Sequence, residues 1–248
     1  MQQLHYGFSL FYEEIKPKGQ VVVITEFDRY SHMRYQEKFM TGLARALMYC
    51  DHFAALDYSD KFILYKNTWP LFDHLEKHYA SILHFGTAFD DHRLLHDEYT
   101  AVDFENPNLR MKDMDPEQFA KMIPLWMPVK DKFVKFLMNP MKSLQLTHYE
   151  MTYLLAQILW TVQDVIGISE NAQRVAEEVS EQIASELHNY YVYDMRLTNY
   201  APRLVKLTKL IAAAKAVLNA KKDVFVIARV FDLFDCDVVG ADLCDWKN

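Results

Sequence analysis

Residues 53–69 of this chain read FAALDYSDKFILYKNTW, and this stretch decides how the fold is interpreted. The polar group DYSD within it predicts a turn, because Asp and Ser side chains bond to nearby backbone groups. Ser59 then offers an N-cap for a long helix over about residues 60–84. Pro70 removes one hydrogen bond from that helix, so we expect a kink or two abutting helices. Gly86 is suited to end it.

On the N-terminal side of this stretch, the hydrophobic pattern predicts further helices. Apolar residues recur mostly at intervals of three and four between Glu26 and Cys50, which indicates a long amphipathic helix. A short helix around residues 8–15 precedes it. The β-branched run at 21–24 fits either a strand or the entry to the next helix. After the central helix, residues 93–102 predict two short strands around a polar turn.

The C-terminal half shows several helix starts. The sequence DPEQ at 115–118 combines an N-cap, a first-turn proline and a capping-box glutamine, so a helix begins there. Pro124 and Pro128 are expected to break this helix, because proline cannot donate its backbone hydrogen bond. A further helix is then predicted over about residues 129–138.

Three more helices follow. The sequence THYE at 147–150 is a full capping box ahead of an apolar run. Ser169 is a good N-cap for the next helix. A last long helix is predicted from Pro202 to about Phe234. No repeat or linker interrupts the pattern. We therefore expect an all-α domain with a small two-stranded hairpin inserted.

Composition excludes several classes of protein. The chain has 248 residues and only 6 glycines, so Gly-rich loops that bind phosphates are excluded. The net charge of −7 disfavours the binding of a phosphate backbone, and we expect no direct contact with nucleic acid. Its apolar runs are shorter than the ~20 residues that span a bilayer, and the first residues do not have the pattern of a secretory signal. We therefore expect no membrane contact.

No group of residues predicts catalysis or metal binding. His74 and His78 lie at i and i+4, a spacing that can bind zinc, but the glutamate between them is misplaced for a zinc protease. The 3 cysteines do not form a C-x-x-C pair. Cys50 neighbours a histidine two residues on, but residues so close in a helix point in different directions. We therefore expect no enzyme, no metal site and no cofactor.

The stretch quoted above carries a resemblance. Its pattern of F-x-x-L followed by D-K-x-x-L-x-K-x-x-W resembles the signature of the ligand-binding domain of nuclear hormone receptors. A second block supports it, with Glu150 heading a helix, GISE at 167–170, LHNY at 187–190 and NYAPRL at 199–204. The blocks are similar to those of the nematode receptors related to hepatocyte nuclear factor 4.

The resemblance implies a three-layer antiparallel helical sandwich. Residues 1–248 would then be a single ligand-binding domain, with a core over residues 26–235 and a place in the nucleus and also the cytoplasm. Such receptors carry two zinc modules upstream, with four cysteines each, and this chain has 3 cysteines with none before Cys50. The chain would be an isolated ligand-binding domain or a receptor form without DNA binding, and the sequence does not choose.

The resemblance also implies a pocket for a small lipophilic ligand, such as a fatty acid or a sterol. Ala80 stands where fatty-acid-binding members have an arginine that holds the carboxylate, and Lys77 is a candidate replacement. Asp73 and Lys77 could instead pair with each other, and a small or filled cavity is equally compatible. The family register points ten residues inward: Tyr35, Gln36, Phe39, Met40, Asp73, His74, Lys77, Ala214, Val217 and Leu218.

A surface groove is implied as well, which would accept a Leu-rich helix of a coregulator protein and be completed by the last helix. Lys66 matches one basic position of the groove. Met48 stands where the second lysine is expected, and Arg45, one turn earlier, is a candidate substitute. The last-helix pattern matches best at 238–243, where Gly240 weakens a helix. The implied groove residues are Ala44, Met48, Phe62, Lys66, Asp242 and Leu243.

Two further features follow from the resemblance. Glu150 and Arg203 match a structural ion pair of the family, and the capping box is the local alternative for Glu150. Tyr200 and residues 203–211 match a face that mediates dimers, so a homo- or heterodimer is implied. Two functions are therefore open: a ligand-binding domain that recruits coregulators to regulate transcription, or a ligand-independent dimerisation or protein-interaction scaffold derived from a receptor.

Overall fold

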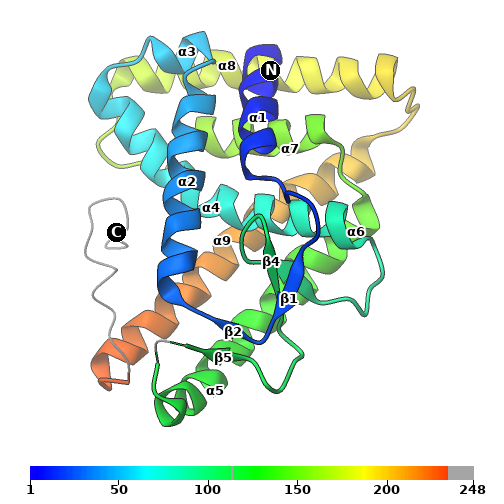
Figure 1. Cartoon of the computed structure of the whole chain (residues 1–248). Helices are drawn as coiled ribbons and strands as arrows, with labels where there is room; N and C mark the ends of the chain where they lie inside the picture. Colours follow the sequence, from blue (N-terminus) through cyan, green and yellow to red (C-terminus); the bar gives the residue numbers. More distant parts are fainter. Residues whose placement is uncertain (113, 234–248) are drawn as a thin grey trace.

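A computed structural model describes residues 1–112 and 114–233, which form a helical sandwich with two small sheets (Figure 1). The helices are α1 (Gln2–Ile15), α2 (Arg29–Leu47), α3 (Asp51–Ala54), α4 (Tyr58–Phe85), α5 (Pro116–Lys132), α6 (Asn139–Leu144), α7 (His148–Trp160), α8 (Glu170–Asn189) and α9 (Ala201–Val230), with π-helical turns η1 (Phe133–Met138) and η2 (Tyr190–Asp194). The strands are β1 (Val22–Ile24), β2 (Glu26–Phe27), β3 (Arg93–Leu95), β4 (Thr100–Asp103) and β5 (Arg110–Met111).

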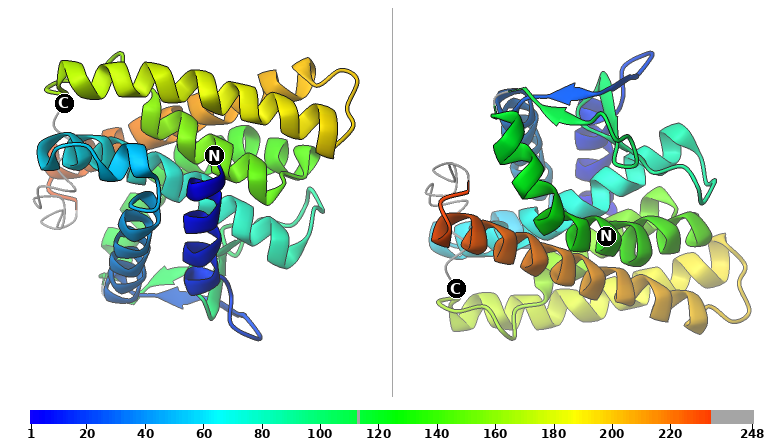
Figure 2. Two further views of the ribbon diagram at one scale, coloured as in Figure 1. Left: turned by 90° about the horizontal axis from the view of Figure 1, so that it is seen from above. Right: turned by 90° about the horizontal axis from the view of Figure 1, so that it is seen from below.

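The helices lie in three layers. Helices α1 and α2 form the front layer, α4 and α7 the middle layer, and α8 and α9 the back layer (Figure 2). The predicted helical sandwich is therefore confirmed. The front pair packs closely because glycine faces the neighbouring helix: a Cβ added to Gly7 would lie 2.4 Å from the carbonyl oxygen of Ala46.

The central helix α4 differs from its prediction in two ways. It begins at Tyr58 with Asp57 as the N-cap residue, so the expected cap at Ser59 is wrong. It also runs through Pro70 as one helix, so the alternative of two abutting helices is wrong. Every residue from Thr68 to Ser81 is buried, and packing on all sides outweighs the cost of one proline, about 3 kcal/mol. Gly86 ends the helix with a positive φ of 96°, as predicted.

Two other boundaries differ from prediction. The helix expected from Glu26 begins at Arg29, because Glu26 and Phe27 pair with β5 and Asp28 caps the helix. Pro124 and Pro128 do not break α5, which continues to Lys132 and then widens into η1. Both prolines are exposed, so water can satisfy the carbonyl groups that they leave unpaired.

The predicted caps downstream are confirmed. The Asp115 side chain accepts hydrogen bonds from two backbone N–H groups at the start of α5. Thr147 and Glu150 form a full capping box on α7, and Ser169 accepts from the backbone of Ala172 on α8. These local signals position α7 and α8 against the core.

The predicted hairpin is also confirmed, since β3 pairs with β4 in antiparallel register. Strand β1 adds to β4 in parallel, which makes a three-stranded sheet and settles the run at 21–24 as a strand. Strands β2 and β5 form a separate parallel pair. Among the described residues, no helix combines the length and apolar character needed to cross a membrane.

Candidate functional site

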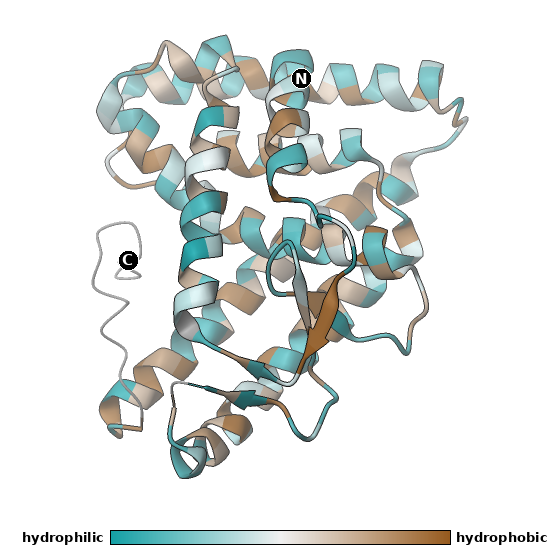
Figure 3. Cartoon of the chain, in the orientation of Figure 1, coloured by the Kyte–Doolittle hydropathy of each residue, from teal (hydrophilic) through white to brown (hydrophobic). Residues whose placement is uncertain are grey.

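The middle of α4 brings ionisable side chains into the interior of the protein. Figure 3 shows hydrophilic residues along this central helix beside hydrophobic ones. Five of them are at most 9% exposed: Asp73, His74, Glu76, Lys77 and His78. Charged groups are rarely buried without compensation, so this concentration marks the interior as a candidate site.

Lys77 and Asp73, both among the described residues, do not form the ion pair that their spacing allows. The Lys77 ammonium lies 5.0 Å from the centre of the Tyr35 ring, a cation–π arrangement. An Asp73 carboxylate oxygen lies 3.8 Å from Nδ1 of His74. Burial, with nearby positive charges, lowers the pKa of His74 well below its usual value, so this histidine is neutral at pH 7.

Three residues that the sequence analysis missed face the same cluster. Burial lowers the pKa of Lys221 even though Asp73 opposes the shift. Burial and the charge of Lys77 lower the pKa values of both His32 and His96, whose rings stack 5.5 Å apart. Lys221 continues the inward spacing of Val217 and Leu218 on α9, so periodicity offered a signal for it. His96 lies beyond β3, where no helical spacing applies.

Glu76 is a buried carboxyl group that lacks hydrogen bonds from the described residues. Both of its carboxylate oxygens are buried and have no hydrogen-bond partner among the described residues. Burial, reinforced by Asp73 and opposed by Lys77, raises its pKa to about 8. Glu76 is therefore mostly protonated at neutral pH.

His74 and His78 both pack against Phe133 of η1. Nδ1 of His78 lies 2.6 Å from the carbonyl oxygen of His74. Burial lowers the pKa of His78 to about 4, so it is neutral at pH 7. Across residues 1–112 and 114–233, no group of three or more potential metal ligands is close enough to hold an ion.

The structure brings part of the predicted pocket together. Tyr35, Asp73, His74 and Lys77 meet in the cluster described above. Phe39 instead packs edge-on against Phe11 of α1. The remaining predicted pocket residues lie on two helices. Gln36 and Met40 are half-buried on α2, and Ala214, Val217 and Leu218 are buried on α9.

The predicted groove residues lie at the end of α2 and in the first turns of α4. Met48 is 49% exposed, and Ala44, Phe62 and Lys66 are half-buried. Lys66 has no ion-pair partner among the described residues, so its ammonium is available to a partner. Arg45 instead donates to Glu14 on α1 at 2.8 Å. The predicted groove residues Asp242 and Leu243 lie outside the described residues, as does the whole last-helix match at 238–243 with Gly240.

The ion pair between Glu150 and Arg203 is present and joins α7 to α9. Nε of Arg203 lies 2.5 Å from one carboxylate oxygen and Nη2 lies 2.7 Å from the other. Tyr191 donates to the same carboxylate at 2.8 Å. Burial would raise the pKa of Glu150, but hydrogen bonds from Arg203, the backbone of Thr147 and Tyr191 outweigh it and lower the pKa.

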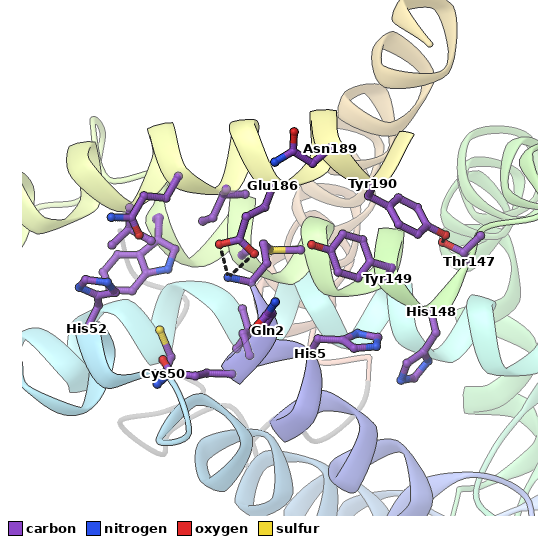
Figure 4. Close-up of a pocket in the computed structure, with 18 of the residues that line it drawn as sticks. Gln2, His5, Cys50, His52, Thr147, His148, Tyr149, Glu186, Asn189 and Tyr190 are labelled. Atoms are coloured by element: carbon purple, nitrogen blue, oxygen red, sulfur yellow. Dashed lines mark hydrogen bonds and ion pairs between the residues drawn. The ribbon is translucent and has the colours of Figure 1, made fainter. Parts of the chain in front are cut away.

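A separate cleft of about 990 Å³ opens between α1, α7 and α8 (Figure 4). Figure 4 shows Gln2 and His5 on α1, Tyr149 and His148 on α7, and Glu186 and Asn189 on α8. A smaller cleft of about 290 Å³ lies beside Tyr79 and Met141. None of the ten predicted pocket residues lines either cleft.

Comparison with known sequences gives one consistent result. The family model for the ligand-binding domain of nuclear hormone receptor matches residues 18–231. Nuclear hormone receptor family member nhr-213 of Caenorhabditis elegans is 26% identical over 212 residues, which are 84% of this chain and 50% of that protein. Family member nhr-130 of the same organism is 23% identical over 239 residues, or 94% of this chain and 53% of that protein. The chain thus spans about half the length of these relatives.

A solved structure shows the same fold. The ultraspiracle ligand binding domain from Drosophila melanogaster superposes with a TM-score of 0.63 and covers 98% of this chain and 93% of that chain. The two sequences are 14% identical, so the likeness supports the architecture alone.

Proposed function

The chain belongs to the family of nuclear hormone receptor ligand-binding domains, and we propose that it regulates transcription by binding a small ligand inside and a coregulator helix outside. This family consists of receptors that are generally not enzymes and that bind small lipophilic ligands. The match over residues 18–231 carries the proposal. The proposal includes three further points. Residues 1–248 form a single domain, Tyr200 and residues 203–211 form a dimer face, and the protein acts in the nucleus.

The interior cluster supports a lipophilic ligand with an acidic group. Lys77 and Lys221 are the basic side chains of the cluster and Asp73 is an acidic one, while Glu76 is mostly neutral because its pKa is raised to about 8, and His74 is neutral. Counted by formal charge, two lysines face one aspartate, and a carboxylate such as that of a fatty acid would balance them.

Native mass spectrometry of the chain purified from cells tests this ligand. We expect a co-purifying acidic lipid that is lost from the Lys221→Met variant and kept in Lys121→Met, whose lysine is exposed on α5. A protein without any bound small molecule would contradict the ligand proposal.

The coregulator groove rests on Lys66, which is half-buried near the start of α4 and unpaired within the described ranges. A basic side chain there can bond the C-terminal carbonyl groups of a docked helix. We expect Lys66→Glu combined with Phe62→Asp to abolish the binding of a fluorescein-labelled Leu-rich peptide in fluorescence polarisation. Lys121→Glu should bind like the wild type, and unchanged affinity in the double variant would remove the groove.

A scaffold without ligand is the second candidate. It is favoured by the position of the two clefts, neither of which is lined by a predicted pocket residue. Under this alternative, the native mass spectrum contains a dimer with no small molecule. A dimer that loses a lipid mass on activation would instead support the receptor function.

A further inference from the structure

The cleft between α1, α7 and α8 lies apart from both proposed sites, because it shares no residue with the interior cluster or with the groove. Its volume of about 990 Å³ is in the range of small-molecule sites. The geometry points to a binding site for a small aromatic molecule that carries a protonated amine. The inference does not depend on the proposed receptor function.

The floor of the cleft is apolar and offers one unused donor. The indole Nε1 of Trp160 is buried and has no hydrogen-bond partner within the described chain. An unmade buried hydrogen bond costs free energy, so a ligand oxygen that accepts from it would be stabilised. The rest of the floor consists of buried apolar side chains: Leu4, Ala156, Val179 and Ile183.

Aromatic rings form one wall. Tyr149 of α7 and Tyr190 stack with their ring centres 4.4 Å apart, and the ring of His5 lies 5.3 Å from that of Tyr149 (Figure 4). Such a wall suits the face of an aromatic ligand, and electron-rich rings also attract a cation.

The charge of the cleft selects a cation. Glu186 and Asp194 line it, and no lysine or arginine does so among the described residues. Of the three lining histidines, His5 and His148 are neutral at pH 7, because burial lowers both pKa values, that of His148 to about 4. The two carboxylates, one of which contacts the Met1 amine, therefore make the cleft acidic.

The structure contains an example of the predicted contact. The α-amino group of Met1 lies 3.2 Å from each carboxylate oxygen of Glu186 (Figure 4). Glu186 thus holds an ammonium group over the apolar floor. A ligand amine would take the same place, with its ring between the floor and Tyr149 and an oxygen toward Trp160.

Tyramine has this combination of phenol and ammonium, and isothermal titration calorimetry at pH 7 tests it. We expect saturable binding of tyramine that weakens at least about tenfold in Glu186→Gln and severalfold in Trp160→Phe. Glu181→Gln changes an exposed carboxylate on α8 outside the cleft and should leave the affinity unchanged. The matched anion 3-(4-hydroxyphenyl)propionate should not bind.

Absence of saturable tyramine binding, equal affinity for the anion, or unchanged affinity in Glu186→Gln would each overturn the site. Circular dichroism of Glu186→Gln and Trp160→Phe shows whether they keep the helical fold, and Glu186, at 37% side-chain exposure, can be changed without disturbing the core.

Discussion

Two buried glutamates of this protein have opposite electrostatic environments. Glu150 at the start of α7 and Glu76 in the middle of α4 are each at most 1% exposed. Glu150 accepts hydrogen bonds from Thr147, Tyr191 and Arg203, and these bonds lower its pKa. Glu76 has no partner among the described residues, and burial raises its pKa to about 8. Burial alone therefore does not determine the charge of a carboxyl group.

The difference separates a structural role from a candidate binding role. A carboxylate whose partners come from the same chain is already compensated, so the network around Glu150 holds α7 against α9 and needs no ligand. Glu76 retains unused hydrogen-bonding capacity, and Nε2 of His74 and Nε2 of His78 elsewhere on α4 also have no partner in the described part of the chain. This contrast supports the interior of α4 as the place where a ligand binds.

A large effect is expected where the compensation is removed. Arg203→Ala leaves Glu150 buried with its main charge partner gone, and loss of one partner of a buried pair costs about 3–5 kcal/mol. We expect the free energy of unfolding to fall by about 3 kcal/mol in urea denaturation at pH 7, at the low end because Arg203 is partly exposed.

Arg203→Lys is the matched control. It keeps the positive charge but loses the bidentate contact and the bond from Nη1 to the carbonyl oxygen of Leu144, so an intermediate loss is expected. If Arg203→Ala lowered the free energy of unfolding by less than about 1 kcal/mol, Arg203 would contribute little to compensating Glu150. The contrast between Glu150 and Glu76 would then be lost.

The second effect depends on pH. The pKa of Glu76 in the folded state, about 8, lies above the usual value of 4.5, so the folded protein retains a proton that the unfolded chain has lost between these two values. The contribution of Glu76 to stability therefore falls as pH rises from 4.5 to about 8, by about 1.4 kcal/mol per pH unit. Glu76→Gln removes this loss of stability. The free energy of unfolding of the variant should therefore increase relative to that of the wild type as pH rises.

Urea denaturation of both proteins at pH 5, 6.5 and 8 measures this gain. Burial lowers the pKa values of His74 and His78 below the usual 6.5, so their contributions to stability rise with pH up to about that value. Both proteins carry these histidines, so the contributions cancel in the difference. Parallel stability curves would mean that Glu76 is as well compensated as Glu150.

Most helices could be predicted because their signals are local. The N-cap at Asp115 and the capping box at Thr147 involve residues within one turn, and they start helices as expected. The prediction of two abutting helices at Pro70 failed because the propensity of proline competes with burial on all sides of α4, which depends on the distant helices packed around it. The short strand β2 was missed because its partner β5 lies more than 80 residues away.

The candidate site was predicted only in part for a related reason. Tyr35, Asp73 and Lys77 stand at positions that the family resemblance points inward, and they were found in this way. Whether Glu76 would have a partner depends on three-dimensional contacts, and its sequence neighbours give no sign of the deficit. The cleft at Trp160 and Glu186 combines three helices, each of which has ordinary amphipathic spacing, so no segment of sequence marks it.

The smallest effect is expected at an exposed pair that otherwise resembles the Glu150 contact. Arg45 and Glu14 meet at 2.8 Å, but their side chains are 62% and 43% exposed. Water already solvates both charges, so Arg45→Ala should change the free energy of unfolding by less than about 0.5 kcal/mol. Urea denaturation in low salt and in high salt checks this, because screening should erase even that change. A loss comparable to that of Arg203→Ala would show that contact distance, and not burial, governs these pairs.

The same variant should also leave coregulator-peptide affinity unchanged, because Arg45 is engaged with α1 and not with the groove.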